Sequence, residues 1–206
     1  KISPLSLTLP YLAFTPVFMI ATGGLLLNEI PNDWGLLGIL TTCIGSYVLN
    51  LNPDQPRLTA PLKAVFNETG SWMMLIVAFI FSIAAVVGKK GILHSTPLFF
   101  NMFFFAAFNL LFLFLLRIFG KIRFSTFREQ PLRGLVAGAL IFAHALLHGF
   151  AISMTKAAYM ISIKRFSILF GVVYGGLVFK ERRIVTRFIG AALMLSGAVL
   201  IVLKGA

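Results

Sequence analysis

The sequence predicts an all-α membrane protein, a polytopic bundle of hydrophobic helices. Hydrophobic residues occupy 59% of the 206 positions and charged residues only 12%. Because a soluble domain carries about 25% charged residues, this chain has too little polar surface to cover a water-soluble globule. Its charges lie between long apolar runs, and most of these runs reach the roughly 20 residues that a helix needs to cross the hydrocarbon layer.

Helices are expected rather than a transmembrane β-barrel. Lipid offers no hydrogen bonds to a bare backbone, so an apolar run must satisfy its own N–H and C=O groups. The strands of a barrel alternate polar and apolar residues over segments of about 10 residues. The run Phe99–Leu116 is almost unbroken Phe, Leu and Ala and has no such alternation.

Seven transmembrane helices are expected. In chain order they are Leu5–Leu27, Trp34–Leu51, Ser71–Val87, Pro97–Leu116, Gly134–Ile152, Ala157–Phe179 and Ile184–Leu203. The fourth has a clear start, because Thr96 can cap a helix that begins at Pro97. Pro10 and Pro16 are expected to kink the first, which suits a helix that lines a cavity and moves.

The net charge of +12 does not indicate nucleic-acid binding. The basic residues cluster between predicted helices, at Arg117–Arg133 and Lys180–Arg187, as they do in the loops of membrane proteins. The only cysteine, Cys43, lies within a predicted helix, which leaves no disulfide framework and no cysteine metal site. No cofactor and no metal ion are expected.

The beginning of the chain is repeated at its end with an offset of 152 residues. This offset superimposes Phe14 on Phe166, Gly23–Gly24 on Gly175–Gly176, Leu25 on Leu177, Glu29 on Glu181, Gly38 on Gly190 and Gly45 on Gly197. Both copies consist of a long helix with a double glycine, a terminal Glu, a short loop, and a second helix with two glycines seven residues apart.

The positions of the two copies predict a larger fold. Three predicted helices precede the late copy and none precedes the early copy. A five-helix repeat therefore implies a ten-helix protein of which this chain lacks the first three helices. Because five is odd, the two halves would be upside down relative to each other. Inverted repeats of this kind are typical of transporters.

Two stretches also share the motifs of a known family. The early one, Pro10–Tyr47, contains Thr15–Pro16, Gly23–Gly24, Asn28–Pro31 and Gly45–Tyr47. The late one, Ala157–Leu203, contains Ser162–Ser167 and Phe179–Glu181. Through these motifs the chain resembles the EamA domains of the drug/metabolite transporter superfamily.

The resemblance implies how the chain is divided and what it does. Residues 1–52 correspond to the last two helices of a first EamA-like repeat, residues 53–70 to a linker, and residues 71–206 to a five-helix second repeat. The implied activity is alternating-access movement of a small organic metabolite or drug, often efflux, and not catalysis. The implied location is a multi-pass protein of the bacterial inner (plasma) membrane.

Lys164 and Arg165 are the first candidates for contact with a solute. They lie about eight residues inside the sixth predicted helix, or ~12 Å along its axis. A charge in hydrocarbon costs at least ~2.5 kcal/mol, so the pair is expected to line an aqueous path and attract an anionic or carboxylate-bearing solute. Neutral hydrogen bonds would come from Tyr159, Ser162, Ser167 and Tyr174. The alternative is that both bases reach the nearer membrane surface.

His144 and His148 are four residues apart and share one face of the fifth predicted helix. Because histidine titrates near neutral pH, we consider proton coupling or substrate contact, with hydrogen bonding to neighbouring helices as the alternative. Glu29 and Glu181 lie at helix ends, where we expect them to fix turns and pair with loop bases such as Arg182 or Arg183.

The expected partners are a small-molecule solute and the lipid bilayer. Small residues at Gly134 and Gly138, and again at Gly171 and Gly175, allow helices to approach closely. We interpret this spacing as packing within one molecule, with a homodimer contact as the alternative.

Two other function classes remain as alternatives to a permease. A membrane-embedded enzyme would need a nucleophile, a carboxylate pair or a metal site, and the sequence offers none that is convincing. A seven-helix receptor or a non-transporting membrane subunit fits the helix count but leaves the internal repeat unexplained. The orientation also stays open, because the loop charges place the C-terminus outside whereas the family usually has it inside.

Overall fold

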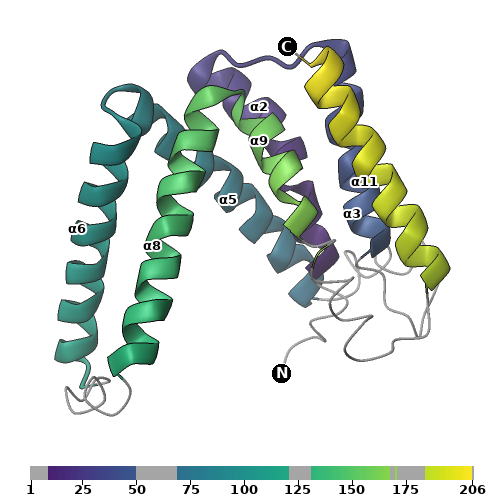
Figure 1. Cartoon of the computed structure of the whole chain (residues 1–206). Helices are drawn as coiled ribbons and strands as arrows, with labels where there is room; N and C mark the ends of the chain where they lie inside the picture. The colour runs from purple at the N-terminus through teal and green to yellow at the C-terminus, as the bar shows by residue number, and fades with distance from the viewer. Residues whose placement is uncertain (1–8, 50–68, 121–130, 168–169, 171–183, 206) are drawn as a thin grey trace. The chain divides into compact units, whose positions relative to one another are not determined.

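The structure, a computed structural model, describes residues 9–49, 69–120, 131–167, 170 and 184–205, and every element in these ranges is helical. Figure 1 labels the helices. The chain divides into two compact units. The first contains Lys1–Val87 and Thr155–Ala206, and the second contains Gly88–Met154.

The elements follow the predicted apolar runs. In chain order they are η1 (Leu9–Phe14), α2 (Thr15–Leu27), α3 (Asp33–Leu49), α5 (Thr69–Leu93), α6 (Pro97–Ile118), α8 (Pro131–Met154), α9 (Ala157–Lys164) and α11 (Ile184–Lys204). Among the described residues, α5, α6 and α8 are long and apolar enough to cross a membrane. Shorter apolar helices cover Tyr11–Leu27, Asp33–Leu49 and Phe188–Lys204. The described elements are thus all helical and are consistent with a membrane helix bundle, in which three helices have the length and apolar character of a span.

Several helix ends differ from the predicted ones. The first predicted helix is divided into the 3₁₀ helix η1 and the α-helix α2, and Pro16 lies in the first turn of α2. The third continues through Lys89 and Lys90 to Leu93, and Lys90 lies in the last turn, where a basic residue is favourable. The fifth begins at Pro131, a residue type that suits a helix start. Most of the predicted linker, residues 53–68, lies outside the described residues, and so does much of the sixth predicted helix after Lys164.

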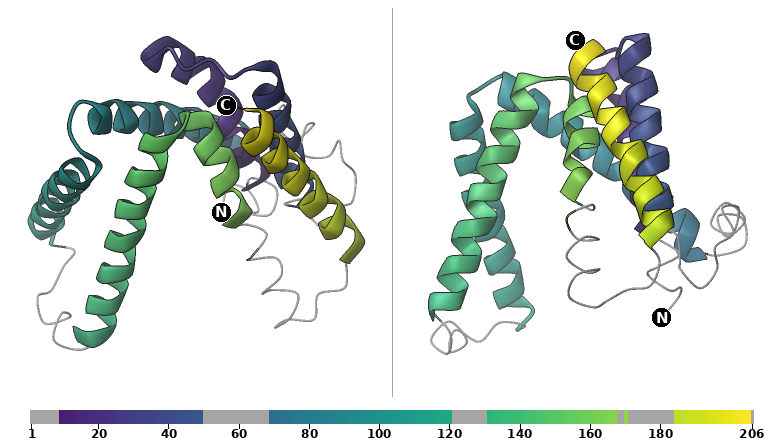
Figure 2. Two further views of the ribbon diagram at one scale, coloured as in Figure 1. Left: turned by 45° about the horizontal axis from the view of Figure 1, so that its top comes forward. Right: turned by 45° about the vertical axis from the view of Figure 1, so that its right-hand side comes forward.

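In the first unit, α3 and α11 run antiparallel and touch through their glycines (Figures 1 and 2). A methyl group added at Gly38 would lie 2.7 Å from the carbonyl oxygen of Gly197, and one added at Gly197 would lie 2.6 Å from that of Gly38. Gly45 and Gly190 approach each other in the same way, at 2.7 and 2.9 Å. Only glycine allows two helix backbones to come this close.

The loop between α2 and α3 is fixed by asparagines. Asn28 ends α2 in the left-handed region, with φ 54° and ψ 31°, a conformation that asparagine tolerates better than most residues. Asn32 then caps α3, since its Oδ1 accepts the N–H of Gly35 at 2.7 Å. Its Nδ2 donates to the carbonyl oxygen of Lys204 at 2.7 Å. One side chain therefore joins the start of α3 to the end of α11.

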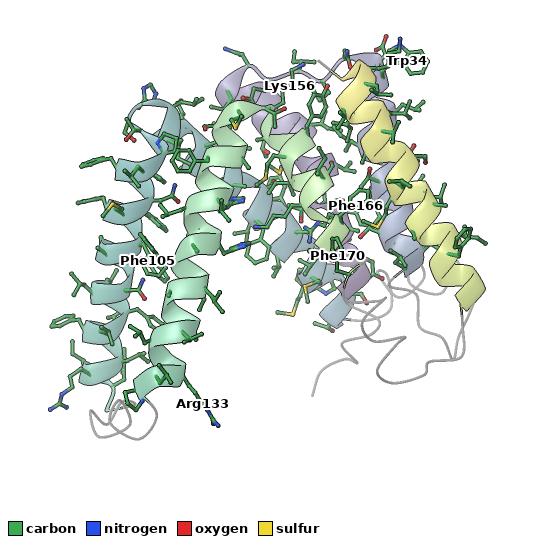
Figure 3. The ribbon with its side chains drawn as sticks, viewed as in Figure 1. Trp34, Phe105, Arg133, Lys156, Phe166 and Phe170 are labelled. Carbon is green, nitrogen blue, oxygen red and sulfur yellow. The ribbon has the colours of Figure 1, made fainter. Side chains whose placement is uncertain are left out.

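The second unit is built on the antiparallel pair α6 and α8. The predicted cap is confirmed, because the Thr96 side chain accepts the N–H of Phe99 at 3.2 Å. The two helices meet where Phe105, labelled in Figure 3, contacts Phe142 with ring centroids 5.2 Å apart. They meet again where the absence of a side chain at Gly149 makes room for the amide of Asn101. No residue of α6 is fully buried among the described residues, which suits a helix surrounded by lipid.

Gly38→Ala is expected to destabilise the protein by about 1–3 kcal/mol, because the new methyl group overlaps the Gly197 carbonyl. The matched control is Gly134→Ala in α8, where no heavy atom of the described residues lies within 4 Å of the added methyl, so the close helix packing predicted at Gly134 is not seen among these residues. That change removes a flexible residue from a helix and should stabilise by about 0.5–1 kcal/mol. Thermal unfolding in detergent measures both. Shifts of the midpoint in the same direction would contradict the close contact between α3 and α11.

Candidate functional site

The predicted basic pair lies at the end of α9, a short helix that packs on α2 and also contacts α3 and α11. The start of α9 is fixed by Glu29, whose Oε2 accepts the N–H of Ala157 at 2.8 Å. A carboxylate at a helix N-terminus satisfies a free N–H group and interacts favourably with the helix dipole. Glu29 was expected to fix the turn between the first two predicted helices and to pair with a loop base such as Arg182 or Arg183; this bond instead joins it to the start of α9. Arg182, Arg183 and Glu181 lie outside the described residues.

Arg165 follows α9 and is half-buried. Its guanidinium donates from Nη2 to the carbonyl oxygen of Leu12 in η1 at 2.7 Å. The hydroxyl of Thr15 donates to the same oxygen at 2.8 Å. In an α-helix this carbonyl would accept the N–H of residue 16, but Pro16 has none. Arg165 thus supplies a hydrogen bond at the place where proline interrupts the helix.

The remaining donors of Arg165 are only partly used. Its Nε is buried and has no hydrogen-bond partner among the described residues. Arginine carries five N–H donors and keeps its charge in proteins. A guanidinium in this setting can therefore take a further acceptor, and its charge favours an anionic one.

Lys164 and Ser167 differ from Arg165 in their surroundings. Lys164 is the last residue of α9 and is exposed, and Ser167 is exposed as well. Phe166, labelled in Figure 3, stands between Arg165 and Ser167 in the sequence and marks this end of α9. Tyr174 lies outside the described residues. The structure thus brings Lys164, Arg165 and Ser167 to one end of α9.

Tyr159 lies at the other end of α9 and is only 3% exposed. Its ring packs on Gly35, where any side chain would overlap it, and its hydroxyl donates to Asn32 Oδ1 over 3.5 Å. The Nζ of Lys156, labelled in Figure 3, lies 5.3 Å from the centre of the ring. Tyr159 therefore fills the contact between α9 and α3.

His144 and His148 belong to α8, in the second unit. Their rings stack, with centroids 6.3 Å apart and planes inclined by 11°. This arrangement confirms that the two side chains share one helix face. The described residues hold no group of three or more His, Cys, Asp or Glu that could bind a metal ion.

Sequence reasoning missed the acceptor of Arg165. From the sequence, Thr15–Pro16 is a family motif and Pro16 a predicted kink, and no contact between these residues and α9 is predicted. The available signal was the proline itself, because a proline inside an apolar run leaves the carbonyl four residues earlier without its α-helical donor. A polar group from another helix is the usual replacement in a membrane.

Arg165→Ala is expected to lower the free energy of unfolding by about 1–3 kcal/mol, because it removes a charged donor from the Leu12 carbonyl. Lys164→Ala is the matched control, and as a change at an exposed position it should stay within about 0.5 kcal/mol. Both are measured by thermal unfolding in detergent. Equal losses in the two variants would mean that the bond to Leu12 does not support the fold.

Residues 68–203, well over half of the chain, match the model of the EamA-like transporter family. No curated protein and no solved structure matches the chain. The chain is therefore an integral membrane protein that belongs to the EamA-like transporter family, a membrane transporter of the drug/metabolite type.

Proposed function

We propose that this protein exports a small organic metabolite or drug across the bacterial inner membrane by alternating access. The observation that carries the proposal is the match of residues 68–203 to the EamA-like transporter family. Alternating access requires two states of one structure, and inverted repeats are the usual way in which a transporter chain builds them. No chemical step is part of the proposed activity.

The contacts of α3 and α11 support an inverted repeat. The 152-residue offset makes Gly38 equivalent to Gly190 and Gly45 equivalent to Gly197. The observed contacts are crossed, because Gly38 meets Gly197 and Gly45 meets Gly190. Two copies related by a two-fold axis touch in this reciprocal manner. Since the helices are antiparallel, such an axis would lie across them, as in inverted-topology transporters.

The proposed division of the chain follows from this symmetry. Residues 1–52 would supply the last two helices of a first repeat, and residues 71–206 a complete second repeat after the linker 53–70. Each repeat would then contribute one helix to the antiparallel contact, α3 from the first and α11 from the second.

The proposed solute path runs past Lys164 and Arg165. A buried or lipid-facing charge is costly, so two adjacent bases at the end of an apolar helix are best explained by water or a polar solute beside them. Ser167 and Tyr174 are proposed to add neutral hydrogen bonds. Arg165 has the strongest support, because its Nε has no acceptor among the described residues.

The direct test is uptake by the full-length protein in liposomes, with a panel of amino acids, organic anions and cationic drugs. Arg165→Ala and Lys164→Ala are expected to lower uptake of the transported solute about tenfold or more at matched protein levels, because each removes a base from the path. Lys204→Ala, at the exposed end of α11, is the charge-matched control and should transport normally.

Two outcomes would count against the proposal. If the protein moves no solute of the panel in either direction, it is not a general organic-solute permease, and a non-transporting role becomes the better account. If it transports but both base variants behave as Lys204→Ala does, the path lies elsewhere. Uptake into inverted membrane vesicles, driven by a proton gradient, would support the efflux direction.

A further inference from the structure

The Arg165 guanidinium is a charged group without a counter-charge among the described residues. Its only hydrogen bond there is to the Leu12 carbonyl, a neutral acceptor. The described acidic residues are Glu29 and Asp33. Glu29 binds the first N–H of α9, eight residues before Arg165, and Asp33 begins α3. A half-buried cation without a counter-charge favours pairing with an anion. For Arg165 that anion would come from outside the described residues.

The geometry of the guanidinium narrows the class of anion. The Nε–H and one N–H of Nη2 point in the same direction and form a fork that fits two oxygens of a carboxylate or a phosphate. In Arg165, Nε is buried without a partner and Nη2 is bonded to Leu12. Nη2 carries two N–H groups, and an oxyanion that takes this fork displaces the Leu12 carbonyl when the carbonyl holds the N–H on the Nε side.

The Leu12 carbonyl lies close to the place where the helix type changes. It belongs to the 3₁₀ helix η1, whereas Thr15 already begins the α-helix α2. Short 3₁₀ segments within a longer helix often mark hinges. When Nη2 leaves, the carbonyl keeps the hydroxyl of Thr15 but regains no N–H from Pro16. Loss of the Arg165 bond would thus act directly on the junction of η1 and α2.

We propose that Arg165 binds an oxyanion group of the transported solute, a carboxylate or a phosphate ester, in exchange for the Leu12 carbonyl. The exchange links solute binding to the η1–α2 junction. A ligand shifts the equilibrium between two conformations only through contacts that differ between them, and here the Arg165–Leu12 bond is present without the solute and absent with it. This inference rests on the proposed transport function and adds the chemical class of the solute.

Substitutions at Pro16 and Thr15, which lie beside the Leu12 carbonyl, should change the KM for an oxyanion in opposite directions. Pro16→Ala supplies the missing N–H to Leu12, which frees the guanidinium and should lower the KM for an oxyanion about fivefold. Thr15→Val removes the other donor to the same oxygen, which holds the guanidinium more firmly and should raise that KM about twofold. Arg165→Gln should raise it at least tenfold, and Arg165→Lys should keep the preference for anions at a higher KM.

The experiment measures initial uptake by the full-length protein in liposomes. The probes share one ring and differ in charge: benzoate, phenyl phosphate, benzamide and benzylammonium. Benzoate and phenyl phosphate separate a carboxylate from a phosphate ester, and benzamide reports any effect that does not depend on charge. Lys204→Ala is the control. For benzoate and phenyl phosphate, KM is expected to fall in Pro16→Ala, to rise about twofold in Thr15→Val and to rise most in Arg165→Gln. The kcat values should change less, and uptake of benzamide should not change.

Each other outcome overturns the inference. Uptake of benzamide or benzylammonium alone removes the anionic solute but leaves the transport function intact. Oxyanion uptake that is unchanged in Arg165→Gln removes Arg165 from the site. Changes of KM with the same sign in Pro16→Ala and Thr15→Val would contradict the exchange with Leu12.

If Pro16→Ala does not fold, Thr15→Val and Arg165→Lys decide, because an unchanged KM in both contradicts the exchange. Absence of uptake for every probe and for the wider panel counts against the transport function itself.

Discussion

The hydrogen bond between Arg165 and the Leu12 carbonyl is the interaction on which the arrangement of the first unit depends. A helix in a membrane must satisfy its backbone within the protein, and Pro16 prevents the usual bond at this carbonyl. Two side chains donate to this carbonyl instead: the hydroxyl of the neighbouring Thr15, and Arg165 at the end of α9, 153 residues away from Leu12. The break in one helix therefore explains why a charged side chain is present within an apolar part of the chain.

The antiparallel pair α3 and α11 supplies the fixed part of the same unit. Its glycine contacts bring backbone against backbone, and Asn32 joins the two helices at one end. Because close packing of this kind responds to a single methyl group, the pair has little freedom to move. The η1–α2 junction differs from this pair, because it joins a 3₁₀ helix to an α-helix and its Leu12 carbonyl is bonded by the side chains of Arg165 and Thr15.

Local features of the fold could be predicted from the sequence, and contacts between distant residues could not. The apolar runs and the Thr96 cap depend on neighbouring residues, and both were predicted. The helix α5 continues beyond the predicted end at Val87 to Leu93, and Lys90 lies in its last turn, where a basic residue is favourable. The partners of Glu29 and Arg165 are a backbone N–H and a backbone C=O at separations of 128 and 153 residues. Residue types do not show which backbone group a distant side chain contacts. Only Pro16 indicated that the Leu12 carbonyl lacks its α-helical donor.

The measurement that tests the central claim most directly is a double-mutant cycle between Pro16 and Arg165. The four proteins are the wild type, Arg165→Leu, Pro16→Ala and the combination, and their free energies of unfolding are compared in detergent. If Arg165 serves the carbonyl that Pro16 leaves without a donor, Arg165→Leu should cost about 1–3 kcal/mol in the natural background and less than half of that beside Pro16→Ala. Equal costs in both backgrounds would show that Arg165 is held for another reason.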